Sequence, residues 1–247
     1  MLSETERLVS KGIWSDQPRA LVTGAASGIG YAVVKELELY TWEVLGMDVN
    51  PLPSHPYASF IGSVVEPKHC EQAMRLADPE LVVHCAGIGA GTLGLAHSHD
   101  MREDQWQNVI QVNLTGSWNV CKAALAYGSV RSIVLVSSIS ALVNAGRGAR
   151  NANYAASKAG VIGMAKVLAV EYAPRVRVNV ICPGGTETPM VERGRQAAPE
   201  MMAQFEADHP RGRFSGAEEV AAMIVAVGTN EAMTGSVVVV DGGYTAC

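Results

Sequence analysis

Short apolar runs recur along the chain, and the segments between them carry apolar residues at helical spacing. Runs rich in valine and isoleucine that end at Gly, Pro, Asp or Ser are typical of buried strands. They predict strands at Ala20–Thr23, Glu43–Met47, Leu81–His84, Ser132–Ser137, Val176–Ile181 and Ser236–Val240, and a weaker strand at Tyr57–Ile61. The helical spacing predicts helices at Gly30–Leu39, Asp104–Tyr127, Tyr154–Tyr172 and Glu218–Val227. This alternation predicts an α/β fold with a doubly wound parallel sheet and helices on both faces.

Two segments lie outside this alternation. Residues 1–17 form an N-terminal extension, in which Ser3 and Glu6 are spaced as a capping box for a short helix. Residues 188–216 contain Pro189, Pro210 and Gly212, and we expect a long loop that is either a lid or a disordered insert. Because no linker divides the rest, we expect residues 18–247 to form one domain, with the lid at about 188–216.

The composition narrows the function classes. The chain has 247 residues, of which 48% are hydrophobic and 17% charged, so disorder is excluded as its main state. A formal net charge of −5 disfavours a nucleic-acid partner, and no apolar run reaches the roughly 18 residues of a membrane span. The cysteines are scattered without a CxxC pair, and the N-terminus lacks the basic start of a signal peptide. We therefore expect a cytoplasmic, reduced protein with no metal site.

A glycine-rich loop, Thr23–Gly30 (TGAASGIG), directly follows the first predicted strand and opens a helix. Glycines there permit a sharp turn and a close approach to a pyrophosphate, and the helix N-terminus supplies free N–H groups and a positive dipole end. The alternative is a glycine-rich turn with no ligand. The position between strand and helix favours a bound nucleotide.

Asp48 ends the second predicted strand, where a carboxylate accepts hydrogen bonds from an adenosine ribose and repels a 2′-phosphate. Neither Val49 nor Asn50 offers a positive charge to such a phosphate. The alternative is an ordinary turn aspartate at a strand end. Beside the glycine loop, Asp48 favours NAD over NADP.

Tyr154 and Lys158 are four residues apart at the start of a predicted helix, so their side chains share one face. A nearby ammonium favours the phenolate and should lower the tyrosine pKa from about 10 toward neutrality, where proton transfer is efficient. The alternative is a tyrosine packed beside a solvated lysine. Ser138, at a strand end, and Asn113, an amide inside a predicted helix, add further polar groups.

These motifs, taken in order, resemble the short-chain dehydrogenase/reductase family from about Arg19 to the C-terminus. The resemblance rests on Thr23–Gly30, Asp48, a degenerate NNAG element at His84–Gly87, Val112–Leu114, Ser137–Ser138, Tyr154–Lys158, Asn179–Gly184 with Thr188, and Asp241–Gly243. It implies a single Rossmann-type domain and hydride transfer between a nicotinamide and a secondary alcohol or ketone. Within the family, the run Pro183–Met190 is similar to bacterial 3α-hydroxysteroid dehydrogenase/carbonyl reductases.

The resemblance also implies residue roles. Tyr154 would be the general acid or base, Ser138 would orient the substrate oxygen, and Lys158 would lower the tyrosine pKa and bind the nicotinamide ribose. Asn113 would interrupt its helix and hold a water in a proton relay to Lys158. The implied cofactor-binding residues are Gly24, Ser27, Gly28, Ile29, Gly30, Asp48, Ser63, Ala86, Gly87, Tyr154, Lys158, Pro183, Gly184, Thr186 and Thr188.

The departures from the family pattern are local. His84 and Cys85 replace two asparagines, so strand-end hydrogen bonds or adenine contacts should differ, and Ser63 stands near the usual adenine-facing aspartate. The stretch from Glu66 to Leu81 is short, which should trim one outer helix. An insertion lies at 141–153 and carries two arginines, Arg147 and Arg150.

Substrate choice should depend on the lid and on this insertion. The predicted substrate contacts are Ser140, Gly185 and Met190. Met190, Met201 and Phe205 suit an apolar substrate, although a helix that packs its own apolar face explains them equally well. Arg147 or Arg150 would clamp an anionic group, unless both are solvated loop charges, which is commoner.

Alternative functions remain open at this point. An extended-type epimerase or dehydratase generally has a TGxxGxxG loop and a longer C-terminal domain, and an enoyl reductase a wider tyrosine–lysine spacing. A catalytically silent NAD-binding sensor or scaffold should lack Ser138, Tyr154 or Lys158, and all three are present. The expected partners are a small alcohol or ketone and further copies of the chain, in a homodimer or homotetramer built through the two long helices and the C-terminal strand.

Overall fold

A computed structural model of the chain describes residues 17–53, 58–143 and 150–247. Across these residues a parallel, seven-stranded sheet has the order β3-β2-β1-β4-β5-β6-β7. The strands are β1 (Arg19–Thr23), β2 (Glu43–Asp48), β3 (Ser59–Ile61), β4 (Leu81–His84), β5 (Ser132–Val136), β6 (Arg177–Pro183) and β7 (Val237–Val240). Every strand predicted from the sequence is present, with ends that differ by at most two residues. The predicted fold class is confirmed.

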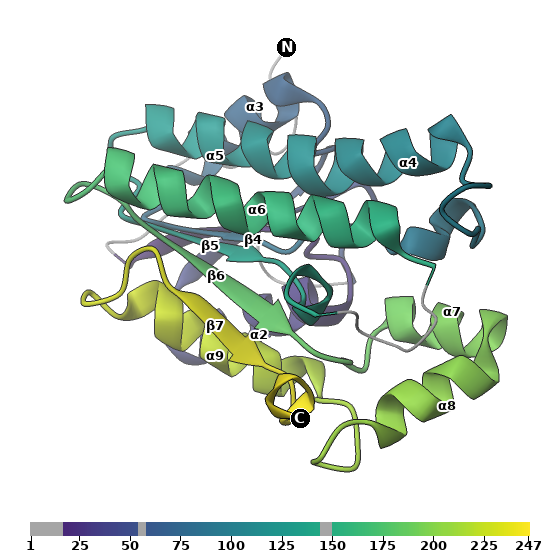
Figure 1. Cartoon of the computed structure of the whole chain (residues 1–247). Coiled ribbons are helices and arrows are strands. Elements are labelled where there is room, and N and C mark those ends of the chain that lie inside the picture. The colour runs from purple at the N-terminus through teal and green to yellow at the C-terminus, as the bar shows by residue number, and fades with distance from the viewer. Residues whose placement is uncertain (1–16, 54–57, 144–149) are drawn as a thin grey trace.

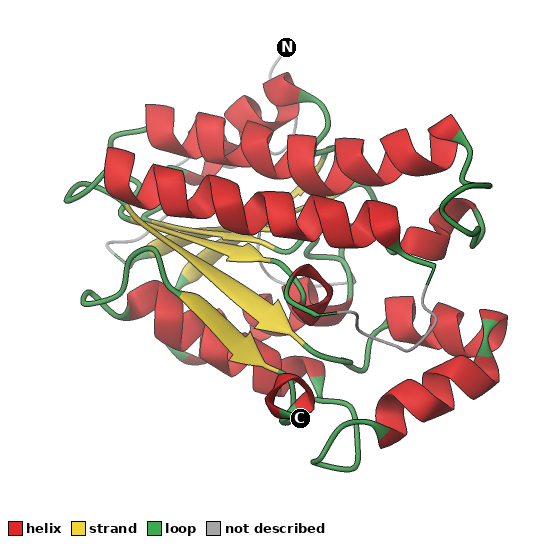
Figure 2. Cartoon of the chain, viewed as in Figure 1, coloured by secondary structure: helices red, strands yellow, loops and turns green. Residues whose placement is uncertain are grey.

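Helices cover both faces of the sheet (Figure 1), and the helix–sheet–helix layering is plain in Figure 2. One face carries α3 (Pro67–Ala77), α5 (Gly116–Ala126) and α6 (Ala152–Glu171). The other carries α2 (Gly28–Leu39) and α9 (Ala217–Thr229). The chain leaves β1 in one direction for β2 and later returns on its other side as β4, so the strand order reverses there. A crevice at the carboxyl ends of the strands is expected at such a point.

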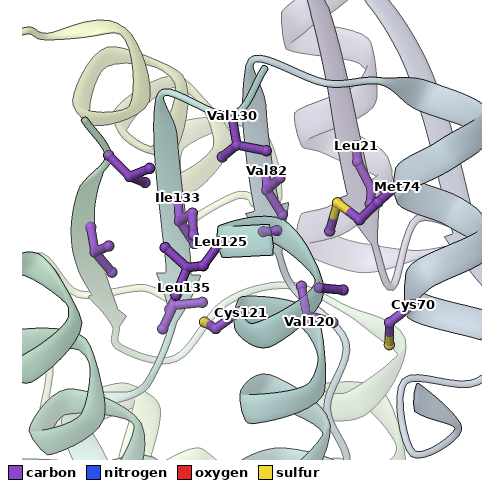
Figure 3. Close-up of a cluster of buried hydrophobic side chains, with 14 of the residues drawn as sticks. Leu21, Cys70, Met74, Val82, Val120, Cys121, Leu125, Val130, Ile133 and Leu135 are labelled. Carbon is purple, nitrogen blue, oxygen red and sulfur yellow. The ribbon is translucent and has the colours of Figure 1, made fainter. Parts of the chain in front are cut away.

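The hydrophobic core consists of two clusters, one on each face of the sheet, because the central strands are buried on both faces. Leu21, Val82 and Ile133 point toward α3 and α5, where they meet Met74 and Cys121 (Figure 3). Their neighbours along the same strands point to α2 and α9. Every residue of β5 is buried. This explains why the strands appear in the sequence as continuous apolar runs and not as alternating ones.

The long helix predicted at Asp104–Tyr127 is interrupted. It consists of α4 (Glu103–Ile110), a π-helical turn at Gln111–Thr115 and α5. Asn113 lies at the centre of the π turn and is completely buried. Such turns often mark functional sites, and this one turns the asparagine amide away from its own helix.

The expectation of a long loop at residues 188–216 is wrong. The segment forms α7 (Pro189–Ala197) and α8 (Pro199–Ala207), which meet at Ala198. Each helix begins with proline at its first position, where a fixed φ and a missing N–H favour helix initiation. Thr188 caps α7 by accepting a hydrogen bond from Val191 N at 3.4 Å. The prolines therefore start helices here.

Short helical turns complete the fold, at Ala90–Leu93, Ile139–Ala141 and Tyr244–Ala246. Residues 1–16 and 144–149, which include Arg147, lie outside the described residues, so the predicted N-terminal helix and the middle of the 141–153 insertion are not placed. No helix in the described ranges is both long and apolar enough to cross a membrane. The same ranges contain no group of three or more His, Cys, Asp or Glu side chains suited to a metal ion.

Candidate active site

A cleft of about 550 Å³ lies at the carboxyl ends of the strands, beneath α7. Loops that follow the six strands β1 to β6 form its walls, which is why residues far apart in the sequence meet there. All of the predicted cofactor, substrate and catalytic residues line this cleft except Asn113. The volume falls within the usual range for small-molecule sites.

The glycine loop is packed tightly between β2 and β4. Gly24 has a φ of +69°, and a Cβ on it would lie 2.7 Å from the backbone nitrogen of Ala86, so no other residue fits. Gly24 N donates to Met47 O at 2.9 Å. Ser27, the N-cap of α2, makes no side-chain cap hydrogen bond. The first turn of α2 therefore presents free N–H groups to the cleft, as an anionic ligand requires.

Asp48 connects β2 to the glycine loop. Its Oδ2 accepts a hydrogen bond from Ala26 N at 3.1 Å, and its Oδ1 accepts one from Asn50 N at 2.9 Å. Lys158 and Arg193 are the only positively charged residues among the described lining, and neither belongs to β2 or to the loop after it. The wall beside Asp48 therefore carries a negative charge with no cation of its own.

Ser138, Tyr154 and Lys158 converge on the cleft from β5 and α6. The Ser138 and Tyr154 side chains are hydrogen-bonded to each other. Lys158 Nζ donates to Val136 O at 2.9 Å and lies 5.7 Å from the centre of the Tyr154 ring. It also approaches the loop after β4, because a Cβ on Gly87 would lie 3.3 Å from it.

Burial is the largest influence on the pKa values of Tyr154 and Lys158. It lowers the pKa of Lys158 from 10.5 to about 8. It raises the pKa of Tyr154 above 10, and the hydrogen bond with Ser138 acts in the opposite direction. The sequence predicts that Lys158 lowers the pKa of Tyr154. In the structure the pKa of Tyr154 is raised, so this prediction is wrong for the chain by itself. The ammonium lies over the ring, and the cost of removing a phenolate from water is the larger effect.

Asn113 lies behind the cleft. Its Oδ1 accepts a hydrogen bond from Ile88 N at 2.8 Å, and its Nδ2 donates to Ile88 O at 3.0 Å and to Ser157 Oγ at 3.2 Å. Ser157 Oγ in turn donates to Tyr154 O at 2.7 Å. The amide thus joins the loop after β4 to the first turn of α6, which carries the tyrosine.

The altered NNAG element ties two strands together. His84 Nδ1 lies 2.7 Å from Thr23 Oγ1, and the same hydroxyl accepts a hydrogen bond from Ala86 N at 3.3 Å. Burial, together with the positive charge of Lys158, lowers the pKa of His84 to about 3, so the ring is neutral. Cys85 lines the cleft, and burial raises the pKa of its thiol to about 12.

The predicted substrate residues line the part of the cleft beneath α7. Met190 reaches across to the loop after β4, where its Sδ lies 3.5 Å from the position of a Cβ on Gly89. Phe205, from α8, also lines the cleft. Arg150 is exposed and absent from the lining. The arginine that does line the cleft is Arg193, three residues after Met190, and sequence reasoning missed it because no local pattern singles it out.

A second residue that sequence reasoning missed is His209. It is buried, its Nε2 accepts a hydrogen bond from Gly185 N at 3.2 Å, and its Nδ1 donates to Phe205 O at 2.7 Å. Its ring packs against Phe205, Phe214 and Tyr244. His209 thus connects α8 to the loop after β6, and no local sequence pattern indicates this.

Comparisons with known proteins agree on one family. The family model described as "Enoyl-(Acyl carrier protein) reductase" matches residues 24–245. A 3-oxoacyl-[acyl-carrier-protein] reductase of Salmonella typhimurium is 31% identical over 240 residues, which cover 91% of this chain and 96% of the relative.

Solved structures show the same likeness. The aldohexose dehydrogenase of Thermoplasma acidophilum superposes with a TM-score of 0.84 at 26% identity, over 94% of this chain and 95% of that one. An oxidoreductase of the short-chain dehydrogenase/reductase family from Burkholderia thailandensis superposes with a TM-score of 0.81 at 26% identity, over 94% of each chain.

Proposed function

The chain belongs to the short-chain dehydrogenase/reductase family and is an oxidoreductase of alcohol or keto groups, and from that premise we propose that it oxidises secondary alcohols or reduces ketones with NAD(H). The observation that carries the proposal is the meeting of Ser138, Tyr154 and Lys158 in the cleft that the glycine loop and Asp48 also line. When bound, the nicotinamide would supply or accept the hydride.

The residues of the cleft fit NAD. The free N–H groups at the start of α2 suit a pyrophosphate, and the positive φ of Gly24 permits the sharp turn that leads into that helix. Asp48 would accept hydrogen bonds from the adenosine ribose, and its charge would repel a 2′-phosphate. Since no cation lies on the neighbouring described wall, we propose NAD over NADP.

Tyr154 would transfer the proton. In reduction it would donate its hydroxyl proton to the carbonyl oxygen, and in oxidation its oxygen would take the proton of the alcohol. Ser138, hydrogen-bonded to the tyrosine, would hold the same substrate oxygen. Lys158, with a pKa of about 8, would carry its positive charge at neutral pH, which would offset part of the burial cost of the phenolate in the oxidative direction.

Asn113 would act through other residues. Both ends of its amide are hydrogen-bonded to Ile88, and Ser157 takes a further bond. We therefore propose that its side chain positions Ile88 and the first turn of α6. The water-holding role that the resemblance implies for Asn113 stays a prediction.

A second candidate substrate class is a 3-oxoacyl thioester, because the Salmonella relative carries that activity in its name. The chemistry is the same, since the reacting group is again a ketone. Enoyl reduction is disfavoured by the four-residue spacing of Tyr154 and Lys158. A catalytically silent NAD-binding sensor or scaffold is disfavoured because Ser138, Tyr154 and Lys158 are all present.

The test is a comparison of initial rates with NAD and NADP on a panel of hydroxysteroids, aryl alcohols and 3-hydroxyacyl thioesters. We expect turnover with NAD, at least tenfold better than with NADP. Tyr154→Phe should lower kcat by about 100-fold or more and leave the Kd for NADH within twofold. Tyr127→Phe, a tyrosine outside the cleft, is the matched control.

Unchanged turnover in Tyr154→Phe would overturn the mechanism. A strong preference for NADP would overturn the cofactor assignment. Activity restricted to small polyols would contradict the apolar character proposed for the lid.

A further inference from the structure

Three charged residues line the cleft in the described part of the chain, namely Asp48, Lys158 and Arg193. The proposed function uses two of them. Asp48 accepts hydrogen bonds at the end of β2, and Lys158 lies beside the tyrosine. Arg193 has no part in the proton transfer or in the proposed ribose contacts.

The position of Arg193 follows from the geometry of α7. It is three residues after Met190, so the two side chains share a face of the helix. Met190 lies against Gly89 on the opposite wall, which shows that this face is turned toward the cleft. Arg195 lies about 200° round the helix from Arg193, on the far side. There it pairs with Glu187 at 2.7 Å and Glu206 at 3.2 Å.

Arg193 differs from the other arginines of this region in its pairing. Arg195, Arg211 and Arg213 each form an ion pair with a glutamate. Within the described ranges, Arg193 has neither an ion pair nor a hydrogen bond. Arg193 is exposed at the edge of the cleft that it lines, where its planar set of donors is free to bind an anionic group, and carboxylates and phosphates match that geometry.

We propose that Arg193 binds an anionic group of the substrate, so that the enzyme prefers alcohols or ketones that carry a carboxylate or phosphate on an apolar skeleton. This inference rests on the proposed function for the identity of the reacting group. The apolar skeleton follows from the neighbouring lining residues Met190, Val191 and Phe205. The anionic end would bind at α7 and the reacting carbon would lie at Tyr154.

The first test measures binding and needs no turnover. Hexanoate, hexyl phosphate and 1-hexanol share a six-carbon tail and differ in the head group. In the presence of NADH, we expect one or both anions to bind to the native protein at least about tenfold more tightly than the alcohol. Arg193→Ala should abolish that preference and leave the affinity for 1-hexanol unchanged, and Arg193→Lys should restore part of it.

Arg75→Ala is the matched control for net charge, because Arg75 is an exposed arginine on α3, far from α7 (Figure 1). It should bind all three probes as the native protein does. Equal affinities for the anions in the native protein and in Arg193→Ala would overturn the proposal. A loss of NADH affinity in Arg193→Ala, with anion binding unchanged, would assign the arginine to the cofactor and also overturn it.

The second test links binding to turnover. A keto acid and its methyl ester should differ in KM by about tenfold in the native enzyme and by less than twofold in Arg193→Ala, with kcat for the ester unchanged. Turnover of the ester without any preference for the acid would refute the role of Arg193 and leave the dehydrogenase intact. Anion binding through Arg193 without turnover of either compound would refute the dehydrogenase and leave the anion site intact.

Discussion

His84 is a buried imidazole at the end of β4, and its environment makes the positively charged form costly. Burial and the charge of Lys158 lower its pKa from 6.5 to about 3. In the unfolded chain the same group takes up a proton as the pH falls below about 6.5. The unfolded state therefore binds more protons between these two values, and the free energy of unfolding decreases as the pH is lowered through that window.

We predict that His84→Asn loses less stability in mild acid than the native protein does. At pH 5 the histidine should account for about 2 kcal/mol of the native protein's loss relative to pH 7.5. The measurement is urea unfolding at both pH values. Thr23→Val, which removes the hydroxyl beside His84 and keeps the titrating ring, should be less stable at both pH values and keep the native pH dependence. The same acid loss in His84→Asn and the native protein would contradict the assignment.

At the scale of the elements, α7 and α8 are held to the body of the protein by an aromatic cluster made of Phe205, His209, Phe214 and Tyr244. His209 joins this cluster to Gly185, which lines the cleft. The hydrogen bonds of the ring require a neutral imidazole with its proton on Nδ1. The position of α8 and the shape of the loop after β6 are therefore coupled through one side chain.

We predict that His209→Phe keeps the ring packing and loses the bond to Gly185 N. A buried N–H without a partner costs about 1–3 kcal/mol, which should lower the Tm by about 2–6 °C. KM for the substrate should rise several-fold, because Gly185 and α8 both border the substrate end. His209→Gln retains an acceptor and should recover part of both losses. A variant with native Tm and native KM would contradict this coupling.

At the scale of the molecule, the sheet creates the site by bringing six strand ends together. The helices that cover one face of the sheet leave apolar residues exposed. Trp118 on α5 is 46% exposed, and Val167 and Val170 on α6 are 63% and 81% exposed. The two helices lie next to each other on the outer surface (Figure 1). Exposed apolar residues grouped in this way favour association, so we propose that this face is an interface of a homodimer or homotetramer.

We predict that the double variant Val167→Glu/Val170→Glu is smaller in solution than the native protein. Charges placed opposite their own copies across a symmetric interface repel each other and lose apolar contact. Light scattering after size-exclusion chromatography measures the mass. Leu39→Glu, at a residue 78% exposed on α2, is the control and should keep the native mass. A monomeric native protein, or an unchanged mass in the double variant, would rule out this interface.

Much of the fold could be predicted because the signals are local. A strand buried on both faces has to be apolar along its whole length, so the runs that became β1, β4 and β5 are visible without any partner. The glycine loop depends on the positive φ of Gly24, and a glycine can be recognised from the sequence without any structure. The same holds for the residues that line the cleft, since parallel strands bring their following loops to one edge.

The helices α7 and α8 could not be predicted in the same way. A proline can stand at the start of a helix or just beyond its end, so Pro189 and Pro199 alone do not predict a helix. The few apolar residues of α7 and α8 also give a weak helical pattern. A helix was an open alternative for this segment, but the place of Arg193 at the cleft depends on how α7 packs over the strand ends, which no local pattern shows.

The sequence by itself determined the sheet, the glycine loop and the chemical identity of the side chains at the cleft. Only the tertiary structure decided the direction of the Tyr154 pKa, the place of Asn113 behind the cleft and the connection from His209 to Gly185. The reason is physical. A strand or a turn depends on neighbours along the chain, whereas solvation and charge at a group depend on every segment that folds around it.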